Sequence, residues 1–260
     1  MRCKKCNNRL ADHDIWCVAC GTQTQVLKTS LAATASLRKT REHLRNRIGE
    51  MVPATGFSII LGVIPIAVLT WVFHNYVNTE GTVQLFTVLA IKAVLYSLFL
   101  AFLLLPFSVI GNDQEYCLKL KQLWMNRRSY PRYLVFSLIN SIYFIIIYLV
   151  CFGVPGFASD PILRLVWVVL VNYWMAIALP APVIMEKMNL TPFRAILLSY
   201  RHLHDARWNI YLLVLILGVM NLVAFSLAIF PLLFTLPLSY FALRDYVYLL
   251  DSFELFEYRM

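Results

Sequence analysis

The sequence has little charge: Asp, Glu, Lys and Arg make up 14% of its 260 residues, against about 25% in soluble domains. A soluble protein of this length needs more polar surface, so an ordinary soluble domain is excluded. Glycine is scarce, at nine residues, whereas Phe, Trp and Tyr supply 14% of the chain. This balance favours transmembrane helices with interfacial aromatic side chains over a membrane barrel. Together with an apolar share of 60%, it predicts an all-α integral membrane protein.

The chain also lacks the residue groups on which most enzymes depend. It contains no Ser-His-Asp set, no phosphate-binding glycine loop and no acidic metal cluster. His202 and His204 stand two apart, and on a helix this spacing directs side chains to different faces, which is poor metal geometry. No Asp or Glu falls inside a predicted span, so the sequence offers no carboxylate relay for ion-coupled transport. We therefore expect a protein without enzymatic activity.

Six apolar stretches are long enough to cross a bilayer, which takes roughly 17–25 residues as helix. They cover residues 56–75, 84–110, 132–152, 163–185, 208–224 and 226–243. The last two share only the 36 residues from Trp208 to Leu243, so a re-entrant pair is the alternative to two full crossings. No cleavable signal peptide is expected, because the first apolar run follows about fifty largely polar residues.

The loops between these spans differ sharply in charge. Residues 111–132 contain five Lys and Arg and residues 186–207 contain four, whereas 76–83 and 153–162 contain none. Cytoplasmic loops retain Lys and Arg. The asymmetry therefore predicts six spans with both termini in the cytoplasm.

Four cysteines near the N-terminus form two Cys-x2-Cys pairs separated by ten residues: Cys3, Cys6, Cys17 and Cys20. Each pair can present two thiolates to one ion, and two pairs complete a closed tetrahedral Zn2+ site with no open position for catalysis. Disulfides are the alternative, but they belong to an oxidising compartment, and this end is predicted to be cytoplasmic. The spacing therefore predicts a structural zinc ribbon over residues 1–22.

The charge of this ribbon bears on its partner. Four basic and two acidic side chains in residues 1–22 give +2, and four thiolates on one divalent zinc contribute −2, so the loaded ribbon is close to neutral. Binding to a nucleic-acid backbone relies on a concentrated positive surface. Nucleic acid is therefore not the expected partner. We expect a docking module for a protein partner or a second copy of the chain, or a stiff N-terminal cap.

The positive charge lies in the next segment, residues 23–54. Five charges fall within ten residues, at Arg38, Lys39, Arg41, Arg45 and Arg47. One helical stripe of apolar side chains accompanies them, at Leu37, Leu44, Ile48 and Met51. The pattern predicts a basic amphipathic linker that anchors on anionic lipid headgroups at the cytoplasmic surface. The alternative is a solvated charged linker that marks the cytoplasmic side.

A Leu-Pro pair recurs late in each span that returns to the cytoplasm, at Leu105-Pro106, Leu179-Pro180 and Leu236-Pro237. An amphipathic segment follows each pair. The second of these is expected to begin with Thr191 as N-cap and Pro192 at the first helical position. In the third, Tyr246 and Leu250 line up with Asp245 elsewhere on the helix. We predict three units of hairpin plus interfacial helix over residues 55–260, although prolines also occur in membrane helices for packing alone.

Two stretches carry a family resemblance, LPAPVIMEKMNLTPFRAILLSYRHLHDARWNIYLLVLILGVMNLV and TLPLSYFALRDYVYLL. They resemble bacterial membrane domains related to the glycerophosphodiester phosphodiesterase membrane region, over roughly residues 165–250. Those domains end in an LPL…YRDL-like stretch, which here is FALRDY, without the usual Tyr before Arg244. The resemblance implies a six-helix, non-catalytic module in the inner (plasma) membrane of a bacterium. The phosphodiesterase activity of that family lies in a separate soluble domain. The stretch containing the four cysteines likewise resembles N-terminal zinc ribbons fused to bacterial membrane proteins.

Polar residues within the spans decide between a scaffold and a carrier. Lys92 stands eight residues into a long span and is expected to extend its amine to the outer face. Asn140, Asn172 and Asn221 suit hydrogen bonds between helices as well as a transport path. The sequence therefore favours a non-catalytic binding or scaffold protein with a zinc-ribbon docking module. The alternative is a passive carrier or channel for a lipid-like or small solute.

We predict one zinc ion per chain, because four thiolates at this spacing complete a closed site. Metal analysis of the purified protein should give one zinc per chain, and Cys17→Ser should lose it, while Cys151→Ser, which changes a single thiol outside the motif, should keep it. A metal-free wild type, or disulfides among the four cysteines, would contradict the prediction.

Overall fold

The structure is a computed structural model that describes residues 36–41, 44–45, 47–77, 82–111, 118–152, 161–227 and 230–251, together with Cys6; side chains at 82–83 and 202–208 are not described. Every regular element in this part is a helix. The predicted ribbon, apart from Cys6, lies outside the described residues.

A short helix covers residues 36–41, and the helices that follow it extend to Asp251. They are α2 (Ile48–Ser58), a π-helix (Ile59–Val63), α3 (Ile64–Tyr76), α4 (Thr82–Leu104), α5 (Phe107–Ile110), α6 (Leu120–Met125), a 3-10 turn (Asn126–Ser129), α7 (Tyr130–Phe152), α8 (Pro161–Ala178), α9 (Ala181–Lys187), α10 (Pro192–Leu227) and α11 (Leu232–Asp251). Five helical stretches in this part are long and apolar enough to cross a membrane: Ile48–Tyr76, Gln84–Leu104, Leu120–Phe152, Pro161–Lys187 and Asn209–Leu227. The chain is thus an all-α, multi-pass membrane protein.

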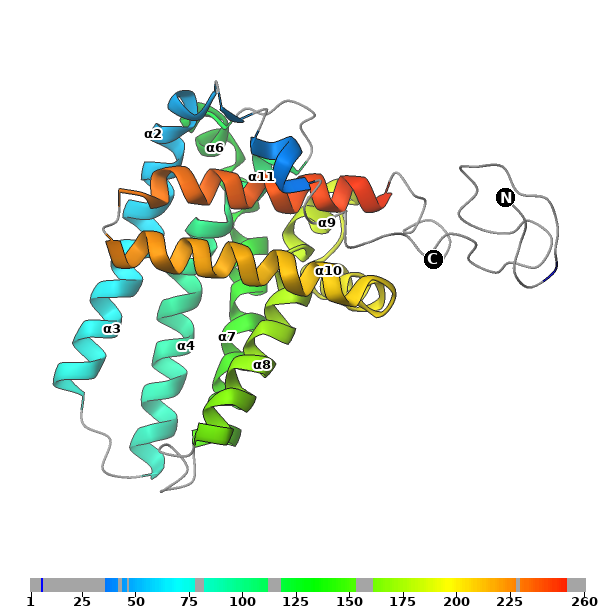
Figure 1. Cartoon of the computed structure of the whole chain (residues 1–260). Coiled ribbons are helices and arrows are strands. Elements are labelled where there is room, and N and C mark those ends of the chain that lie inside the picture. Colours follow the sequence, from blue (N-terminus) through cyan, green and yellow to red (C-terminus); the bar gives the residue numbers. More distant parts are fainter. Residues whose placement is uncertain are drawn as a thin grey trace.

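The long helices divide into two directions. In Figure 1, α3, α4, α7 and α8 run alongside one another, and α2, α6 and α9 lie toward one end of them. The helices α10 and α11 lie across this group near the same end, where α11 packs against α2, α5, α9 and α10. The buried core is densest at this end, which therefore holds most of the specific packing.

The predicted sixth span, 226–243, is not among the five candidate membrane helices. Its residues enter α11, which begins at Leu232 and buries polar and charged side chains such as Arg244 and Asp245. The third amphipathic segment was predicted to lie at the membrane surface with Asp245 away from its apolar stripe, but here Asp245 and Tyr246 are both buried in the protein. Burial raises the pKa of the Tyr246 hydroxyl, which stays neutral.

Two of the three predicted Leu-Pro units share a local structure. Leu105-Pro106 separates α4 from α5, and Leu179-Pro180 separates α8 from α9. In each unit the leucine N–H donates to the carbonyl four residues earlier, and the proline carbonyl accepts N–H groups three and four residues later. Proline has no N–H and disturbs the preceding turn of a helix. Each long helix therefore ends at its Leu-Pro pair, and a short buried helix follows, α5 in one unit and α9 in the other. The third pair, Leu236-Pro237, lies inside α11 and makes no such break.

The linker departs from the predicted amphipathic anchor. Residues 36–41 form a short helix, and α2 begins only at Ile48. Leu44 and Met51 of the predicted stripe are buried in the protein core, and Leu37 and Ile48 pack against it. The stripe therefore covers the protein's own helices and leaves no continuous apolar face for the bilayer.

A left-handed residue ends α9. Asn189 has a φ of 50°, its N–H donates to the carbonyl of Glu186, and the next N–H, of Leu190, donates to the carbonyl of Met185. These bonds form a Schellman motif, in which Asn takes the place usually held by Gly. The new helix α10 then begins at Pro192, as predicted from Thr191 and Pro192, but it continues to Leu227 as one helix rather than an interfacial helix followed by a separate span.

Replacing Asn189 tests this turn. Asn189→Val should lower the free energy of unfolding by about 1–2 kcal/mol, because a β-branched side chain is strained in the left-handed region. Asn189→Gly should leave it unchanged or raise it slightly. Unfolding of the purified protein in mixed detergent micelles measures both changes, and equal destabilisation by Val and Gly would contradict the assignment.

Candidate functional site

A set of charged side chains is packed between the helices at the end where α9 and α11 meet, and we call it the charged layer. Its members are Arg132, Glu186, Lys187, Arg244, Asp245 and Asp251. Three are positive and three negative, so the layer is balanced. Buried charges in proteins are tolerated when they are paired and hydrogen-bonded, and the contacts below show how each acid is met.

Glu186 is a buried acid of the layer, with a side chain 7% exposed. The Tyr133 hydroxyl donates a hydrogen bond of 2.9 Å to its Oε1, and Arg132 Nη1 lies 3.8 Å from the same oxygen. Arg132 Nη2 donates to the carbonyl of Leu190 at 2.7 Å, just beyond the Asn189 turn. The first turn of α7 is thereby fastened to the end of α9.

A glycine allows α5 to reach this acid. A Cβ placed on Gly111 would lie 2.6 Å from Glu186 Cβ and 2.7 Å from the Phe107 carbonyl, closer than real Cβ atoms come to a neighbour. The carbonyl of Gly111 accepts a 2.8 Å hydrogen bond from the Tyr248 hydroxyl of α11. The ends of the two short helices that follow the Leu-Pro breaks therefore meet at Glu186, and α11 closes over them.

The remaining charges lie along α11. Lys187 forms an ion pair and hydrogen bond with Asp251, and its Nζ lies 4.1 Å from the centroid of the Tyr248 ring. The guanidinium of Arg244 lies 5.4 Å from the same ring and 5.6 Å from Phe241. Such cation–π contacts stabilise a charge that has lost water. These contacts give the charged layer the character of a structural joint.

A hydrogen bond joins the N-terminal linker to the layer. Thr40 Oγ1 donates to Asp245 Oδ2 at 2.6 Å, and both side chains are buried. Ser36 and Leu44, on the same side of the linker, are also buried. Residues 40 and 245 are thus held together at one end of the bundle.

The outer surface of this end is basic. The five predicted membrane-surface residues Arg38, Lys39, Arg41, Arg45 and Arg47 are all exposed. Four more exposed basic side chains lie on or beside α6, namely Lys119, Lys121, Arg127 and Arg128. A buried, balanced interior thus supports an exposed surface that is mostly basic, with Glu50 as an exposed acid beside Arg47. A mostly basic surface suits contact with anionic lipid headgroups.

Polar residues inside the spans are used between helices. Asn140 accepts a 2.7 Å hydrogen bond from Trp174 Nε1 of α8, and Asn221 donates a 2.8 Å bond to Ser239 of α11. Lys92 Nζ lies 4.9 Å from the centroid of the Phe73 ring on α3. The two asparagines therefore act as interhelical hydrogen bonds.

The described residues include only one of the four predicted zinc ligands. Cys6 is exposed, and Cys3, Cys17 and Cys20 fall outside the described part, where zinc binding stays a prediction. Within that part, no three His, Cys, Asp or Glu side chains gather as a metal site.

Sequence reasoning missed the charged layer. Glu186 follows the fourth predicted span directly and was counted with the loop, although the adjacent Lys187 and the preceding Leu-Pro break were visible signals. Arg244 was noticed only through the FALRDY resemblance, and Asp245 was placed on the polar side of a predicted interfacial helix. Their partners lie up to 205 residues away in the chain, and no local pattern shows such pairing.

None of the protein-family models, curated proteins and solved structures compared with this chain matches it. The resemblance of residues 165–250 to the phosphodiesterase membrane domains therefore stays a prediction.

Removing one hydroxyl tests the Glu186 contact. Tyr133→Phe should lower the free energy of unfolding in mixed micelles by about 1.5–3 kcal/mol, because a hydrogen bond to a charged group is lost. The matched control is Tyr130→Phe on the same helix, whose hydroxyl donates to the Leu98 carbonyl and should be worth about 0.5–1.5 kcal/mol. Equal losses would show that Glu186 carries no special weight.

Limited trypsin digestion tests the linker joint, because the basic residues around Thr40 are cleavage sites. Thr40→Val should speed cleavage within residues 38–47 roughly ten- to a hundredfold, since opening the linker no longer breaks a hydrogen bond to a carboxylate. Thr70→Val, which removes a hydroxyl on α3 that donates to a backbone carbonyl, should leave that rate unchanged. Unaltered cleavage in Thr40→Val would mean that this bond does not hold the linker.

Proposed function

We propose that this protein is a non-catalytic, membrane-embedded docking scaffold. Its cytoplasmic face is formed by the charged layer and the basic surface, and a zinc ribbon at residues 1–22 docks a protein partner from there. The observation that carries the proposal is the Thr40–Asp245 hydrogen bond of 2.6 Å. It fastens Thr40, in the segment that follows the predicted ribbon, to the charged layer, and so supports a fixed attachment point for the docking module.

The topology of the scaffold follows from the same bond. Thr40 precedes the first span and contacts Asp245 of α11, which follows the last one. The two ends of the membrane domain therefore lie on the same side of the membrane, and this requires an even number of crossings. We place that side in the cytoplasm, since the exposed Lys and Arg of the linker and of α6 gather there. The stretches α2–α3, α4, α7 and α8 supply four crossings. We place α10 and α11, which were predicted as the fifth and sixth spans, as a pair that enters from and returns to the cytoplasmic side.

The charged layer supports a scaffold over a transporter. Among the described residues, Glu186, Asp245 and Asp251 each have a donor from another helix, so moving these helices apart would uncover paired charges. A carrier must rearrange its binding site between two sides, whereas a docking platform benefits from a fixed surface.

A passive carrier for a lipid-like solute is the second candidate. One observation favours it, an apolar groove of about 700 Å3 along α2, which falls within the roughly 300–1,000 Å3 of ligand pockets.

Crosslinking in intact membranes followed by purification of the full-length chain tests the scaffold. Wild type should yield one protein at a fixed ratio to the chain, Cys17→Ser should lose it, and Thr40→Val should retain less. Cys151→Ser, a thiol change in α7, is the matched control and should retain it fully.

Reconstituted vesicles supply the opposing measurement. Protein-dependent movement of lipid or small solutes, unchanged by Cys17→Ser and without any partner at fixed ratio, would replace the scaffold with the carrier.

A further inference from the structure

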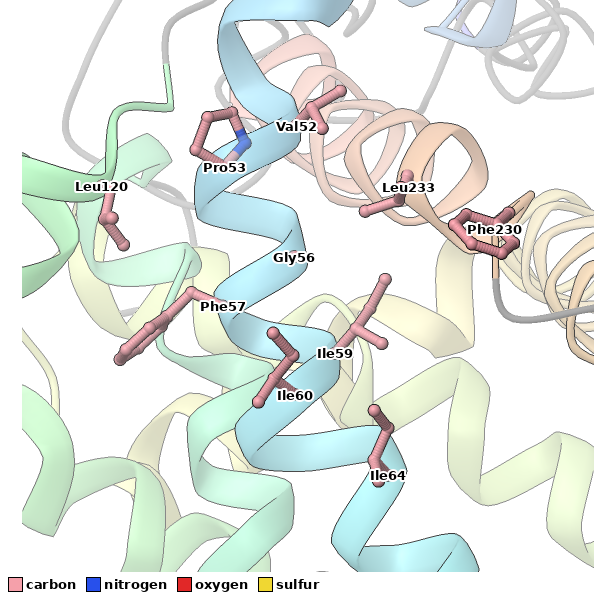
Figure 2. A pocket seen from close by; sticks show the side chains of 10 residues that line it. All are labelled: Val52, Pro53, Gly56, Phe57, Ile59, Ile60, Ile64, Leu120, Phe230 and Leu233. Carbon is pink, nitrogen blue, oxygen red and sulfur yellow. The ribbon is translucent and has the colours of Figure 1, made fainter.

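An apolar groove runs along α2 and the π-helix that follows it. Figure 2 shows its lining residues, with Leu120 of α6 to one side of α2 and Leu233 of α11 with Phe230 to the other. The remaining lining residues are Val52, Pro53, Gly56, Phe57, Ile59, Ile60 and Ile64. Every one of these side chains is apolar, so the groove offers a ligand hydrophobic burial and no hydrogen bond.

Two backbone features make room for it. Gly56 presents no side chain, and a Cβ placed there would meet only Leu233 Cδ2, at 3.8 Å. One turn further, the π-helix Ile59–Val63 replaces regular helix and is held against α4, where a Cβ on Gly62 would lie 3.2 Å from Leu103 Cβ. π-Helical turns in α-helices are frequent at functional sites.

One end of the groove continues into the lipid-facing surface. Ile60 is 60% exposed and Phe230 77% exposed. Beyond Ile64 the same helix carries the exposed apolar residues Val68 and Trp71. A hydrocarbon chain can therefore enter the groove from the bilayer without crossing a polar surface.

The other end of the groove is basic. Arg47 is the N-cap of α2, five residues before Val52, which is about 7–8 Å along a helix. Lys119 is the N-cap of α6 and directly precedes the lining residue Leu120. Both side chains are exposed, and so is the one acidic side chain of the first turn of α2, Glu50. An apolar groove with exposed positive charges at one end matches an acyl chain joined to an anionic headgroup.

We propose that this groove binds one anionic phospholipid of the cytoplasmic leaflet, with an acyl chain along α2 and its phosphate facing Arg47 and Lys119. The lipid would fill the space between α2, α6 and the α10–α11 connection and so belong to the folded protein. This site does not depend on the scaffold role, because the residues that line the groove include neither the four cysteines of the predicted ribbon nor Thr40 and Asp245.

Photolabelling of the full-length protein tests the site. The probe is phosphatidylglycerol with a diazirine in one acyl chain, offered in phosphatidylcholine vesicles, and mass spectrometry locates the labelled residues. In wild type the label should concentrate on the groove residues. Gly56→Leu, which places a side chain in the groove, should reduce that labelling at least about tenfold, because the excluded methylene groups lose their burial.

Gly49→Leu is the matched control, since it lies on the same helix in open space, and it should label as wild type does. Ile60→Trp is a second filling variant at an exposed position, so a folding defect in Gly56→Leu would not decide the result. Labelling spread evenly over the outer faces of α3, α4 and α7, and unaffected by either filling variant, would show ordinary boundary lipid and overturn the proposal. Crosslinks between groove residues and a second polypeptide that form without the lipid probe would show that a protein helix, rather than a lipid, occupies the groove.

The headgroup is tested with the same protein in native mass spectrometry. Wild type should retain phosphatidylglycerol in preference to phosphatidylcholine, and Arg47→Gln combined with Lys119→Gln should abolish the preference while groove labelling persists. An unchanged preference would overturn the placement of the phosphate. Loss of the partner in Cys17→Ser leaves this result untouched, so the scaffold and the lipid site can fail separately.

Discussion

The carboxylate of Glu186 has to be hydrogen-bonded where it lies, because a charge buried among apolar helices is costly unless it is paired. Tyr133 and Arg132 meet it from α7, and a glycine at position 111 lets α5 come close enough to pack against its stem. If one of these helices shifted alone, the buried carboxylate would lose a hydrogen-bond donor, its ion-pair partner or its packing. The relation of α5, α7 and α9 thus follows from one side chain, and α11 is added to it through Tyr248.

The two ends of the bundle differ in how strongly they specify structure. Along α3 none of the residues is fully buried, and contacts there resemble those that any apolar helix makes with a neighbour or with lipid. At the end where α9 and α11 meet, directional bonds join residues from the linker to α11. Lipid tails are as apolar as the helices, so hydrophobic burial alone distinguishes poorly between arrangements in a membrane. Hydrogen bonds and ion pairs at the charged end supply the distinction.

Much of the helical layout could be predicted from the sequence, because span length and loop charge are local properties. The first four spans, the Leu-Pro breaks and the start of α10 at Pro192 were found this way. The fate of α11 could not be predicted, since its hydropathy resembles a span while Arg244 and Asp245 are satisfied by distant elements. The stripe of the linker was correctly recognised as apolar, but its pattern does not say whether lipid or protein covers it.

The π-helix between α2 and α3 has a geometric consequence for the longest apolar stretch. An added residue in a helix turns everything after it by about 100°, since each residue advances the helix by that angle. Here the turn falls between a half that buries Met51, Ala54 and Thr55 against the protein and a half with no buried residue. The π-helix therefore rotates the faces of α3 relative to those of α2. One continuous helix can therefore pack one face against the protein in α2 and present a differently oriented apolar face to the surrounding lipid in α3. The side chains of either half can then change without altering the orientation of the other half.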